Sequence, residues 1–367
     1  MSNIRGFFMA RSLKVAPEYI EKVKQAVQRN SFPSQQALAT ELGIARDTVS
    51  KFFNGKPIDY LNFVEISEKL GLDWQKIALK EEIKPLPPSP FLTGSCITQP
   101  RYFFGRQREL KRIFDLLKRH PLQNAAIIGK QRSGKTSLLH YLKSITTTPA
   151  TQLRVNQKSD WLTHPDNYCW IFVDLQNARM QSREGFLGYI LKCLEMPIPN
   201  PCNLDKFMDA VSGKLQKPTV ILLDEIGVGL QRCPELDDTF WESLRSLATN
   251  YTQGNLAFVL ATPESPIDLA RHTGHTSPFF NIFGYSATLG ALTELEAREL
   301  IASSPIAFAE DDIEWILSQS ECWPILLQIL CRERLFTLED GEIGDNWREE
   351  GLQQIQPFID LLEKPGG

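Results

Sequence analysis

The stretch "IIGKQRSGKTSLLHYL", Ile127 to Leu142, is the strongest indication of fold in this chain. It fits the pattern G-x-x-x-x-G-K-[ST], and an apolar run, "NAAII", leads directly into it. Glycines in such a loop let backbone N–H groups turn toward a phosphate, and the positive end of the following helix attracts the same anion. The pattern predicts a loop that holds the phosphates of a nucleotide; a glycine-rich turn without function is the alternative.

The loop residues have separate expected tasks. Lys135 is expected to reach the β- and γ-phosphates, and the Thr136 hydroxyl is expected to bind Mg²⁺. No N-K-x-D motif, which specifies guanine, is present, so the predicted cofactors are ATP and Mg²⁺. The expected nucleotide contacts in the loop are Gly129, Lys130, Gln131, Arg132, Ser133, Gly134, Lys135, Thr136 and Ser137.

A second apolar run, "TVILLDEI" at Thr219–Ile226, ends in two acids. Ligands of open α/β sheets lie at the carboxyl ends of the parallel strands. Asp224 is therefore expected to bind Mg²⁺, and Glu225 to orient and deprotonate an attacking water. The alternative is an acidic pair that only caps the next helix. Together with the loop, the pair predicts a site for nucleotide hydrolysis.

Short apolar runs alternate with helix-period segments between about 101 and 290, which is typical of a parallel sheet covered by helices. A full strand and helix, 168–195, separate the loop from the acids, and this spacing resembles the additional-strand class of P-loop NTPases. The predicted fold class is α/β, with an all-α N-terminal domain and a C-terminal helical lid. The predicted strands are Asn124–Ile128, Tyr168–Leu175, Thr219–Asp224, Leu256–Thr262 and Ser286–Leu289, and the predicted helices are Ser137–Lys143, Ser182–Glu195 and Asp237–Asn250.

Two further stretches resemble motifs of the AAA+ and STAND-type ATPases. "YFFGRQRELKRIFDLL", which starts at Tyr102, resembles their G-R-x-x-E-L box, and "LATPES", which starts at Leu260, resembles sensor 1. The first resemblance implies that the box packs on adenine. The second implies that Thr262 responds to the γ-phosphate and acts in catalysis with Lys135 and Glu225. The adenine contacts implied by the box are Phe103, Phe104, Gly105 and Arg106.

The tail resembles the lid of STAND and archaeal ATPases, in which a G-x-P motif places a proline against the nucleotide. Here the motif reads Cys322-Trp323-Pro324, so the glycine is replaced and the proline is kept. The resemblance implies adenine-side contacts from Trp323 and Pro324; the alternative is an ordinary helix start with proline in its first turn. The predicted tail helices are Glu294–Ser303, Ala309–Gln319, Pro324–Phe336 and Gln353–Leu362.

Two arginines that these families use are not identified by motif. Arg332 and Arg298 are the options for sensor 2, and Arg245 and Arg271 are the options for an arginine finger. An arginine of this kind contributes about 10³–10⁵ to the hydrolysis rate. The chain is therefore expected to be a slow ATPase as an isolated protomer.

The N-terminal stretch "SQQALATELGIARDTVSKFFNGK", Ser34–Lys56, predicts two short helices with Gly43 between them. It resembles the helix-turn-helix of Cro and phage-repressor domains, and "DYLNFVEISEKLGLDWQKIA" at Asp59–Ala78 resembles their closing helices. The resemblance places a second helix, about Ala45–Phe53, in the major groove of DNA. The implied DNA contacts are Gln35, Gln36, Arg46, Asp47, Ser50, Lys51, Asn54 and Lys56.

The charge distribution supports this interpretation. Residues 1–56 carry nine Lys/Arg and four Asp/Glu, a net charge of +5 within a chain of net charge −4, so the remainder carries −9. A basic head on an acidic body is typical of a DNA-binding module joined to a regulatory domain. Double-stranded DNA is the predicted partner; a helical module for protein contacts is the alternative.

Composition suggests the domain boundaries. The segment 79–100 is rich in proline and is predicted to be a linker. It separates a helix-turn-helix domain, 1–78, from an ATPase core, 101–290, which a helical lid and tail, 291–367, follow. No run approaches the roughly 18 apolar residues that span a membrane. Seven scattered cysteines without a C-x-x-C pair fit the cytoplasm.

Three functions remain open from the sequence. The leading hypothesis is an ATP-dependent switch of the STAND/AAA+ kind, which forms homo-oligomers with ATP and changes how the head meets DNA. The second is an AAA+ ATPase of the transposition type that assembles on DNA, which the acidic body disfavours. The third is a signalling scaffold whose helix-turn-helix domain binds protein.

Overall fold

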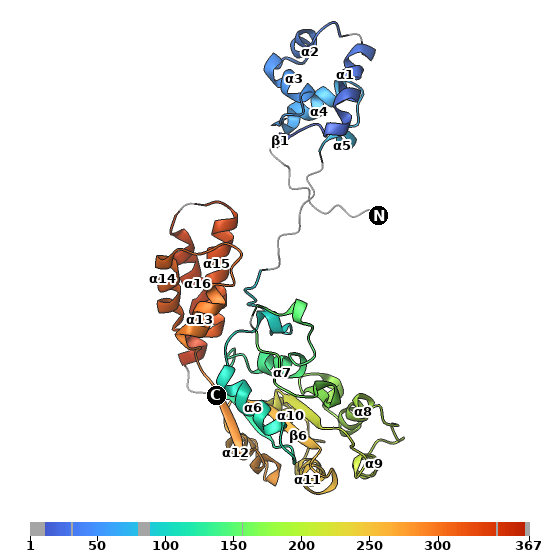
Figure 1. Ribbon diagram of the computed structural model, residues 1–367, viewed down its shortest axis with the longest axis vertical. Helices are drawn as coiled ribbons and strands as arrows, with labels where there is room; N and C mark the ends of the chain where they lie inside the picture. Colours follow the sequence, from blue (N-terminus) through green and yellow to red (C-terminus); the bar gives the residue numbers. More distant parts are fainter. Residues whose placement is uncertain (1–11, 31, 80–88, 156, 343, 364–367) are drawn as a thin grey trace. The chain divides into compact units, whose positions relative to one another are not determined.

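The computed structural model describes residues 12–30, 32–79, 89–155, 157–342 and 344–363. The chain consists of two compact units, which we call the head (12–79) and the body (89–363) (Figure 1). Of the predicted linker, 80–88 lies outside the described residues, and 89–100 belongs to the body. The boundaries of the predicted domains remain predictions.

The head is a small helical unit. Ser34 caps the second helix through a hydrogen bond from Ala37 N–H to its hydroxyl, and Gly43 ends that helix with φ +67°. Phe52 and Phe63 are fully buried at the centre. The head contains α1 (Ile20–Arg29), α2 (Gln35–Leu42), α3 (Arg46–Phe53), α4 (Tyr60–Lys69), α5 (Trp74–Ile77) and an antiparallel strand pair, β1 (Ser12–Leu13) with β2 (Ile58–Asp59).

The body is built on a five-stranded parallel sheet. Its strands are β3 (Ala125–Gly129), β4 (Cys169–Asp174), β5 (Thr219–Asp224), β6 (Leu256–Thr262) and β7 (Tyr285–Leu289). The order across the sheet is β4-β5-β6-β3-β7. Strand β6 therefore lies between the strand that leads into the phosphate loop and the strand that ends in the acids, which confirms the predicted additional-strand arrangement.

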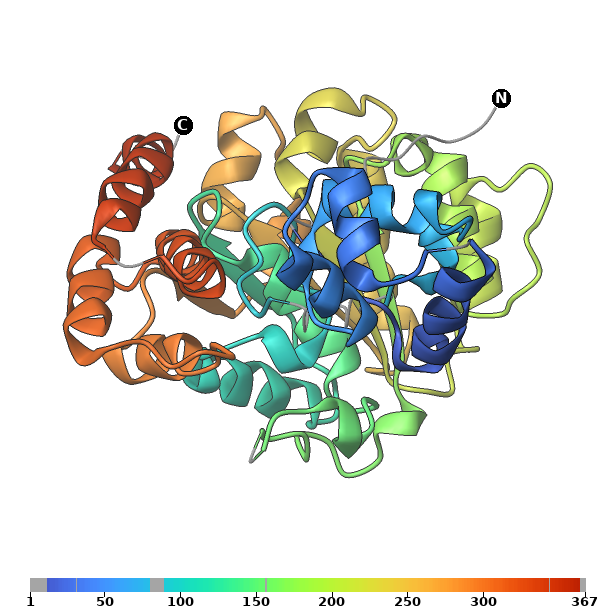
Figure 2. The ribbon, with the colours of Figure 1, turned by 90° about the horizontal axis from the view of Figure 1, so that it is seen from above.

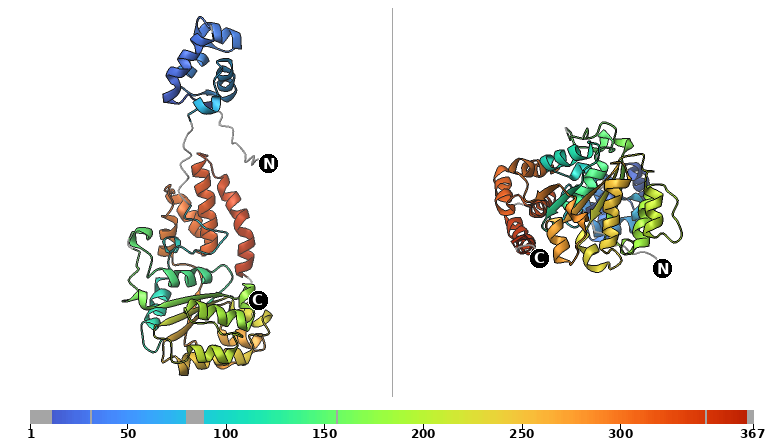
Figure 3. Two further views of the ribbon diagram at one scale, coloured as in Figure 1. Left: turned by 90° about the vertical axis from the view of Figure 1, so that its right-hand side faces the viewer. Right: turned by 90° about the horizontal axis from the view of Figure 1, so that it is seen from below.

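Helices cover both faces of the sheet, because successive strand side chains point to opposite sides (Figure 3). Ile127 packs on one face against α6 and α7, whereas Ala126 packs on the other face in the core that includes α8 to α12. The helices are α6 (Gln107–Leu117), α7 (Lys135–Ser144), α8 (Arg183–Cys193), α9 (Leu204–Val211), α10 (Ile226–Arg232), α11 (Asp238–Ser246) and α12 (Pro266–His272). Short 3₁₀ turns lie at Pro17–Tyr19, Pro100–Tyr102, Ala150–Gln152, Pro165–Asn167, Ala178–Met180 and Pro278–Asn281.

Several predicted helix ends differ from those observed, and two of them lie beside a special backbone conformation. Helix α7 begins at Lys135 rather than Ser137, because Gly134 takes a left-handed conformation with φ +97° immediately before it. Helix α11 ends at Ser246 rather than Asn250, and one π-helical turn, Leu247–Tyr251, continues it.

Four helices form the lid, which lies as a group beside the sheet and its covering helices (Figure 2). They are α13 (Glu294–Ile301), α14 (Glu310–Ser320), α15 (Pro324–Glu339) and α16 (Asn346–Glu363). The predicted last helix covers only the C-terminal half of α16. Gly351 lies in the missed part, and its role is to let α16 approach α15, because a Cβ there would come within 2.9 Å of Leu330.

Among the helices of the described residues, none is both long and apolar enough to cross a membrane.

Candidate nucleotide site

The phosphate loop connects β3 to α7. Local geometry explains why glycine occupies positions 129 and 134 in this loop. A Cβ on Gly129 would lie 2.5 Å from Ser133 Oγ and 3.0 Å from the carbonyl oxygen of Leu289. Only glycine fits between these atoms. Gly134 has φ +97°, which a residue with a side chain rarely adopts. The backbone of the loop therefore packs closely against Ser133 and the end of β7.

Lys135 lies inside this loop. Its Nζ donates hydrogen bonds to the carbonyl oxygens of Gly129, at 2.8 Å, and Lys130, at 3.1 Å. Burial lowers the pKa of the Lys135 amine, and the charges of Glu225 and Asp224 oppose that shift. The nearby Ser133 Oγ is buried without a hydrogen-bond partner. A buried ammonium and an unpaired hydroxyl in one loop are suited to bind an anion.

Asp224 lies buried at the carboxyl end of β5. Burial raises the pKa of its carboxyl to about 6, a hydrogen bond from the Thr136 side chain opposes the shift, and Glu225 and Asp174 add repulsion. Thr136 and Asp224, the two predicted Mg²⁺ ligands, are thus brought together. Their hydroxyl and carboxylate oxygens are of the kind that Mg²⁺ prefers.

Asp174 is a third acid that sequence analysis did not single out. It ends β4 and lies in register with Asp224 of the neighbouring strand. The apolar run "CWIFVD" before it is the same signal that pointed to Asp224.

Glu225 follows Asp224 and precedes α10. Its backbone is left-handed, with φ +53°, and its side chain makes no helix-capping hydrogen bond. The side chain lines the same cavity as Lys135 and Thr136. A left-handed residue other than glycine costs of order 1–3 kcal/mol, and such residues concentrate at functional sites.

Thr262 lies at the end of β6, in register with Ile128 of β3. It is fully buried, and its hydroxyl donates to the carbonyl oxygen of Glu264 at 2.9 Å. Thr262 thus lies at the carboxyl end of a central strand, next to the strand that leads into the phosphate loop. It is not one of the residues that line the cavity.

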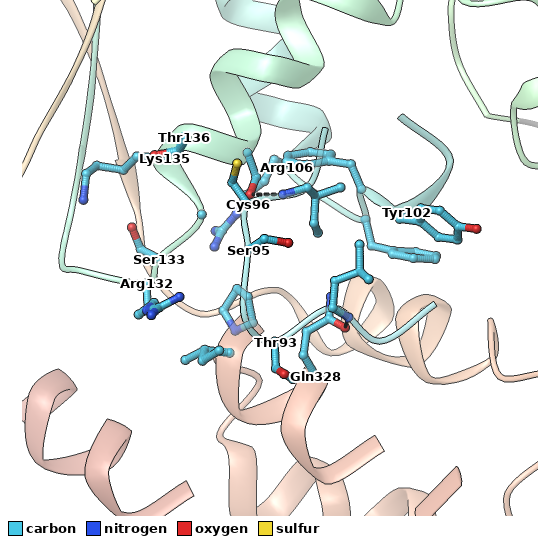
Figure 4. Close-up of a pocket in the computed structure, with 18 of the residues that line it drawn as sticks. Thr93, Ser95, Cys96, Tyr102, Arg106, Arg132, Ser133, Lys135, Thr136 and Gln328 are labelled. Atoms are coloured by element: carbon cyan, nitrogen blue, oxygen red, sulfur yellow. Dashed lines mark hydrogen bonds between the residues drawn. The ribbon is translucent and has the colours of Figure 1, made fainter. Parts of the chain in front are cut away.

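The cavity next to the loop has a volume of about 360 Å³ (Figure 4). Five parts of the chain line it: residues 92–97, the box, the phosphate loop, the residues Gln176 and Glu225 that follow β4 and β5, and the lid. The predicted contacts among the lining residues are Phe103, Phe104, Arg106, Gln131, Arg132, Ser133, Gly134, Lys135, Thr136, Ser137, Glu225 and Pro324. Lining residues that were not predicted include Tyr102, Gln176, Leu292, Ile325 and Gln328.

The two phenylalanines of the box belong to different cores. Phe103 packs with the sheet and α7, 4.5 Å from the ring of Tyr141, whereas Phe104 packs in the lid core. The guanidinium of Arg154 lies 3.9 Å from the ring centroid of Phe104. Residues 103–104 therefore connect the core to the lid at the wall of the cavity.

Gly105 and Arg106 have structural tasks. A Cβ on Gly105, where φ is +73°, would lie 2.8 Å from the Glu296 side chain and 2.9 Å from Leu292. The buried Arg106 guanidinium donates to the carbonyl oxygens of Gly290 and Ala291, the start of the lid.

Pro324 begins α15 and lines the cavity, and Trp323 does not. Glu321 and Cys322 before them are left-handed, with φ +45° and +58°. These two residues turn the chain so that the proline faces the site. On the opposite rim, the Arg132 guanidinium lies 6.0 Å from the ring of Phe358 in α16.

Three of the four arginine options pair with other side chains of the body, and no such pair is seen for Arg245 in the described residues. Arg298 pairs with three lid carboxylates, those of Glu294, Glu310 and Glu314, which raise its pKa. Arg332 donates to the Thr93 hydroxyl and to Glu333. Arg271 is exposed and pairs with Asp268, and the Arg245 Nε is buried without a hydrogen-bond partner. None of these four lines the cavity.

The predicted DNA contacts lie on α2 and α3 of the head, except Asn54 and Lys56, which follow the end of α3. None of the eight is buried, and Gln35 and Ser50 are half-buried. Lys51 pairs with Asp47 at 2.7 Å, and Asn54 donates to the Ser50 carbonyl oxygen at 2.8 Å. Exposed pairs such as Lys51–Asp47 contribute at most about 1 kcal/mol, so a competing phosphate could displace them.

Known proteins resemble both the head and the body of this chain. Residues 34–77 match the family model described as helix-turn-helix. Over 74% of this chain and 77% of the other, the fold is similar to that of the Walker-type ATPase PABY2304 of Pyrococcus abyssi, with a TM-score of 0.52 and 14% identity. The ORC2 protein of Aeropyrum pernix, in its ADPNP–ADP complexes, gives a TM-score of 0.52 and 14% identity over 73% and 71% of the two chains. The body has a P-loop ATPase fold. No curated protein sequence matches the chain.

In this P-loop fold, the residues present fit a magnesium nucleotide. The unpaired Ser133 hydroxyl and the Lys135 ammonium suit phosphate oxygens, and the Thr136–Asp224 pair suits the metal. The described residues include no group of three or more His, Cys, Asp or Glu side chains placed to hold a metal alone. That is the usual situation for Mg²⁺ that binds through one carboxylate and the substrate's phosphates.

Proposed function

We propose that the chain is an ATP-dependent switch of the STAND/AAA+ kind, in which the body binds and hydrolyses ATP with Mg²⁺ and the head binds double-stranded DNA. The observation that carries the proposal is the meeting of Lys135, Thr136 and Glu225 at one cavity, with Asp224 hydrogen-bonded to Thr136, in the same chain as a helix-turn-helix domain. ATP occupancy would favour assembly of protomers in the cytoplasm and alter how the head meets DNA, and hydrolysis would reset the switch.

Each residue has a defined chemical task in this proposal. Lys135 and the N–H groups of the loop bind the phosphates, and Thr136 and Asp224 hold the metal. Magnesium, when bound, neutralises charge on the phosphate oxygens. Glu225 orients a water molecule and accepts its proton. Its carboxylate suits this task because it lines the cavity without a capping hydrogen bond.

The isolated protomer is expected to hydrolyse ATP slowly. Arg245, Arg271, Arg298 and Arg332 lie outside the cavity lining. An arginine supplied by a second protomer would accelerate the reaction by about 10³–10⁵. The proposal therefore includes an ATP-dependent homo-oligomer whose turnover per protomer rises with protein concentration.

The first test is nucleotide binding by calorimetry with Mg–ATP. The Lys135→Ala variant is expected to lose at least about a hundredfold in affinity, because it removes a buried charge from the phosphate site. Lys143→Ala, an exposed lysine near the other end of α7, is the matched control and should bind like the wild type. Unchanged binding in the Lys135 variant would remove the basis of the proposal.

The second test measures duplex DNA binding by the full chain at several salt concentrations, with and without Mg–ATP. The switch predicts salt-dependent affinity that responds to ATP. ATP-dependent filaments on any duplex would favour the transposition-type ATPase instead. Absence of DNA binding at low salt would favour the signalling scaffold.

A further inference from the structure

The segment Leu92–Ile97, which we call the strap, crosses the cavity between core and lid. It follows the head in the chain and precedes the box. Five of its six residues line the cavity: Leu92, Thr93, Ser95, Cys96 and Ile97. In Figure 4, Thr93 lies beside Gln328, whereas Cys96 lies on the side of the core.

On one side, the strap is held by the lid helix α15. The N–H of Leu92 donates to Gln328 Oε1 at 2.9 Å, and Arg332 donates to the Thr93 hydroxyl at 2.5 Å. Gln328 is only 4% exposed, so its bond to Leu92 is shielded from water. The preceding Phe91 is buried in the lid core, with its ring 6.2 Å from that of Phe308.

On its other side, the strap is held by the phosphate-loop helix. The N–H of Ile97 donates to Ser137 Oγ at 3.0 Å, and Ile97 packs against the core of the sheet (Figure 4). Ser137 is the residue immediately after Thr136, and it is buried. The strap is therefore fixed to the same helix turn that is expected to meet the phosphates.

A ligand in this cavity has to contact the strap, the loop and the lid together. Its binding free energy then depends on the position of the strap, and by linkage the strap is stabilised when the ligand binds.

We propose that the strap couples the phosphate-loop helix α7 to the lid helix α15. An occupied cavity clamps Leu92–Ile97 between the two helices, and an empty one releases them. This inference rests on the proposed function of the cavity as a nucleotide site. Arg332 does not line the cavity, so it is then a positioning residue, which acts on the ligand through the strap. By reciprocity, loosening the strap weakens nucleotide binding by the factor by which the nucleotide stabilises the strap.

Hydrogen exchange on the full-length chain tests the clamp. Saturating Mg–ATP is expected to slow exchange of the Leu92 and Ile97 amides by about fivefold or more, because both donate to residues beside the ligand. The Thr93→Val variant keeps the shape of the side chain and removes the hydroxyl that accepts from Arg332. It should reduce this protection and weaken Mg–ATP affinity by about tenfold, the range expected for loss of a charge-assisted hydrogen bond.

Thr93→Ser is the matched control, because it keeps the hydroxyl and should bind Mg–ATP within about twofold of the wild type. An unchanged melting temperature in both variants would separate the effect from general unfolding. If calorimetry records binding while strap exchange is the same with and without Mg–ATP, the strap is a passive wall and the inference fails, with the proposed function intact. If the wild type binds no Mg–ATP, both fail.

Discussion

The head and the cavity of the body differ in whether residues other than glycine have left-handed backbone. In the described part of the head, residues with positive φ are glycines: Gly43, Gly55 and Gly71. Around the cavity, the left-handed residues other than glycine are Arg106, Arg132, Glu225, Glu321 and Cys322. Glycine adopts this conformation without a steric penalty, whereas each of the other residues costs of order 1–3 kcal/mol.

The comparison shows where each unit places its constraints. The head folds with little strain, and its candidate contacts lie on α2, on α3 and just beyond the end of α3. The body holds strained backbone and buried charge at one site, where Lys135 and Asp224 are both desolvated. Such an arrangement persists when the surrounding structure fixes it and when the side chains are needed for function.

The largest expected effect comes from Glu225→Gln. The variant keeps the shape and the left-handed backbone but removes the proton acceptor, so the rate of ATP hydrolysis should fall by about 10²–10⁴. Its affinity for Mg–ATP should stay within a few-fold of the wild type. Steady-state turnover and calorimetry on the same preparation measure both quantities. If the variant hydrolyses ATP at the wild-type rate, the strained backbone of Glu225 does not serve hydrolysis. The contrast between head and body then has no functional basis at this residue.

Asp224→Asn tests the buried charge. Burial raises the carboxyl pKa to about 6 from 3.8, so between about pH 4 and pH 6 the native state binds this proton more tightly than the unfolded state. Stability without ligand therefore falls as pH rises through this window, and the loss persists above pH 6. The asparagine variant removes the loss and should raise the free energy of unfolding at pH 7 by up to about 3 kcal/mol.

Denaturant titrations of the wild type and this variant at pH 4 and pH 7, without magnesium or nucleotide, measure the effect. The gain should appear at pH 7 and shrink toward pH 4. In the presence of Mg–ATP the variant should lose affinity, because the amide is a poorer ligand for the metal. A variant less stable than the wild type at pH 7 would contradict the desolvation of Asp224.

The smallest effects test the backbone directly. Gly43→Ala places a side chain at φ +67°, where nothing lies within 4 Å of the added Cβ. Backbone strain alone should therefore lower head stability by about 1 kcal/mol. Glu225→Gly relieves strain and should raise body stability by about 0.5 kcal/mol, after the larger entropy of the unfolded glycine is included. Hydrogen exchange of head and body amides reports the two changes separately; destabilisation by both substitutions would remove the contrast.

The sequence predicted the sheet well because its strands are buried apolar runs. The bounds of β5 and β6 coincide with the predicted ones, and β7 begins one residue earlier. Helices α6, α9, α10 and α12 were not predicted. Helices α9, α10 and α12 have seven or eight residues, which are too few to establish a helical period, and the residues of α6 were assigned only to the box. Each of these short helices begins at a single residue, the capping side chain of Asn203 or Ser265 or the left-handed backbone of Glu225.

The candidate site was predicted where its residues are adjacent in the chain. The strap was assigned to the linker because prolines lie on both sides of it in the chain. Its partners Gln328 and Arg332 are more than 230 residues away. Local composition carries no information about such contacts. Asp174 was included in a predicted strand, and its closeness to Asp224 depends on the register between β4 and β5.

The split placement of Phe103 and Phe104 has a mechanical consequence. One ring is embedded beneath the sheet helices and its neighbour in the lid, and Arg106 ties the same few residues to Gly290 and Ala291. Two passages of the chain thus meet at one point between the core and the lid. Rotation of the lid about this point would move Pro324 and the α15 anchors of the strap together, so a small tilt at the base would open or shut the whole mouth of the cavity.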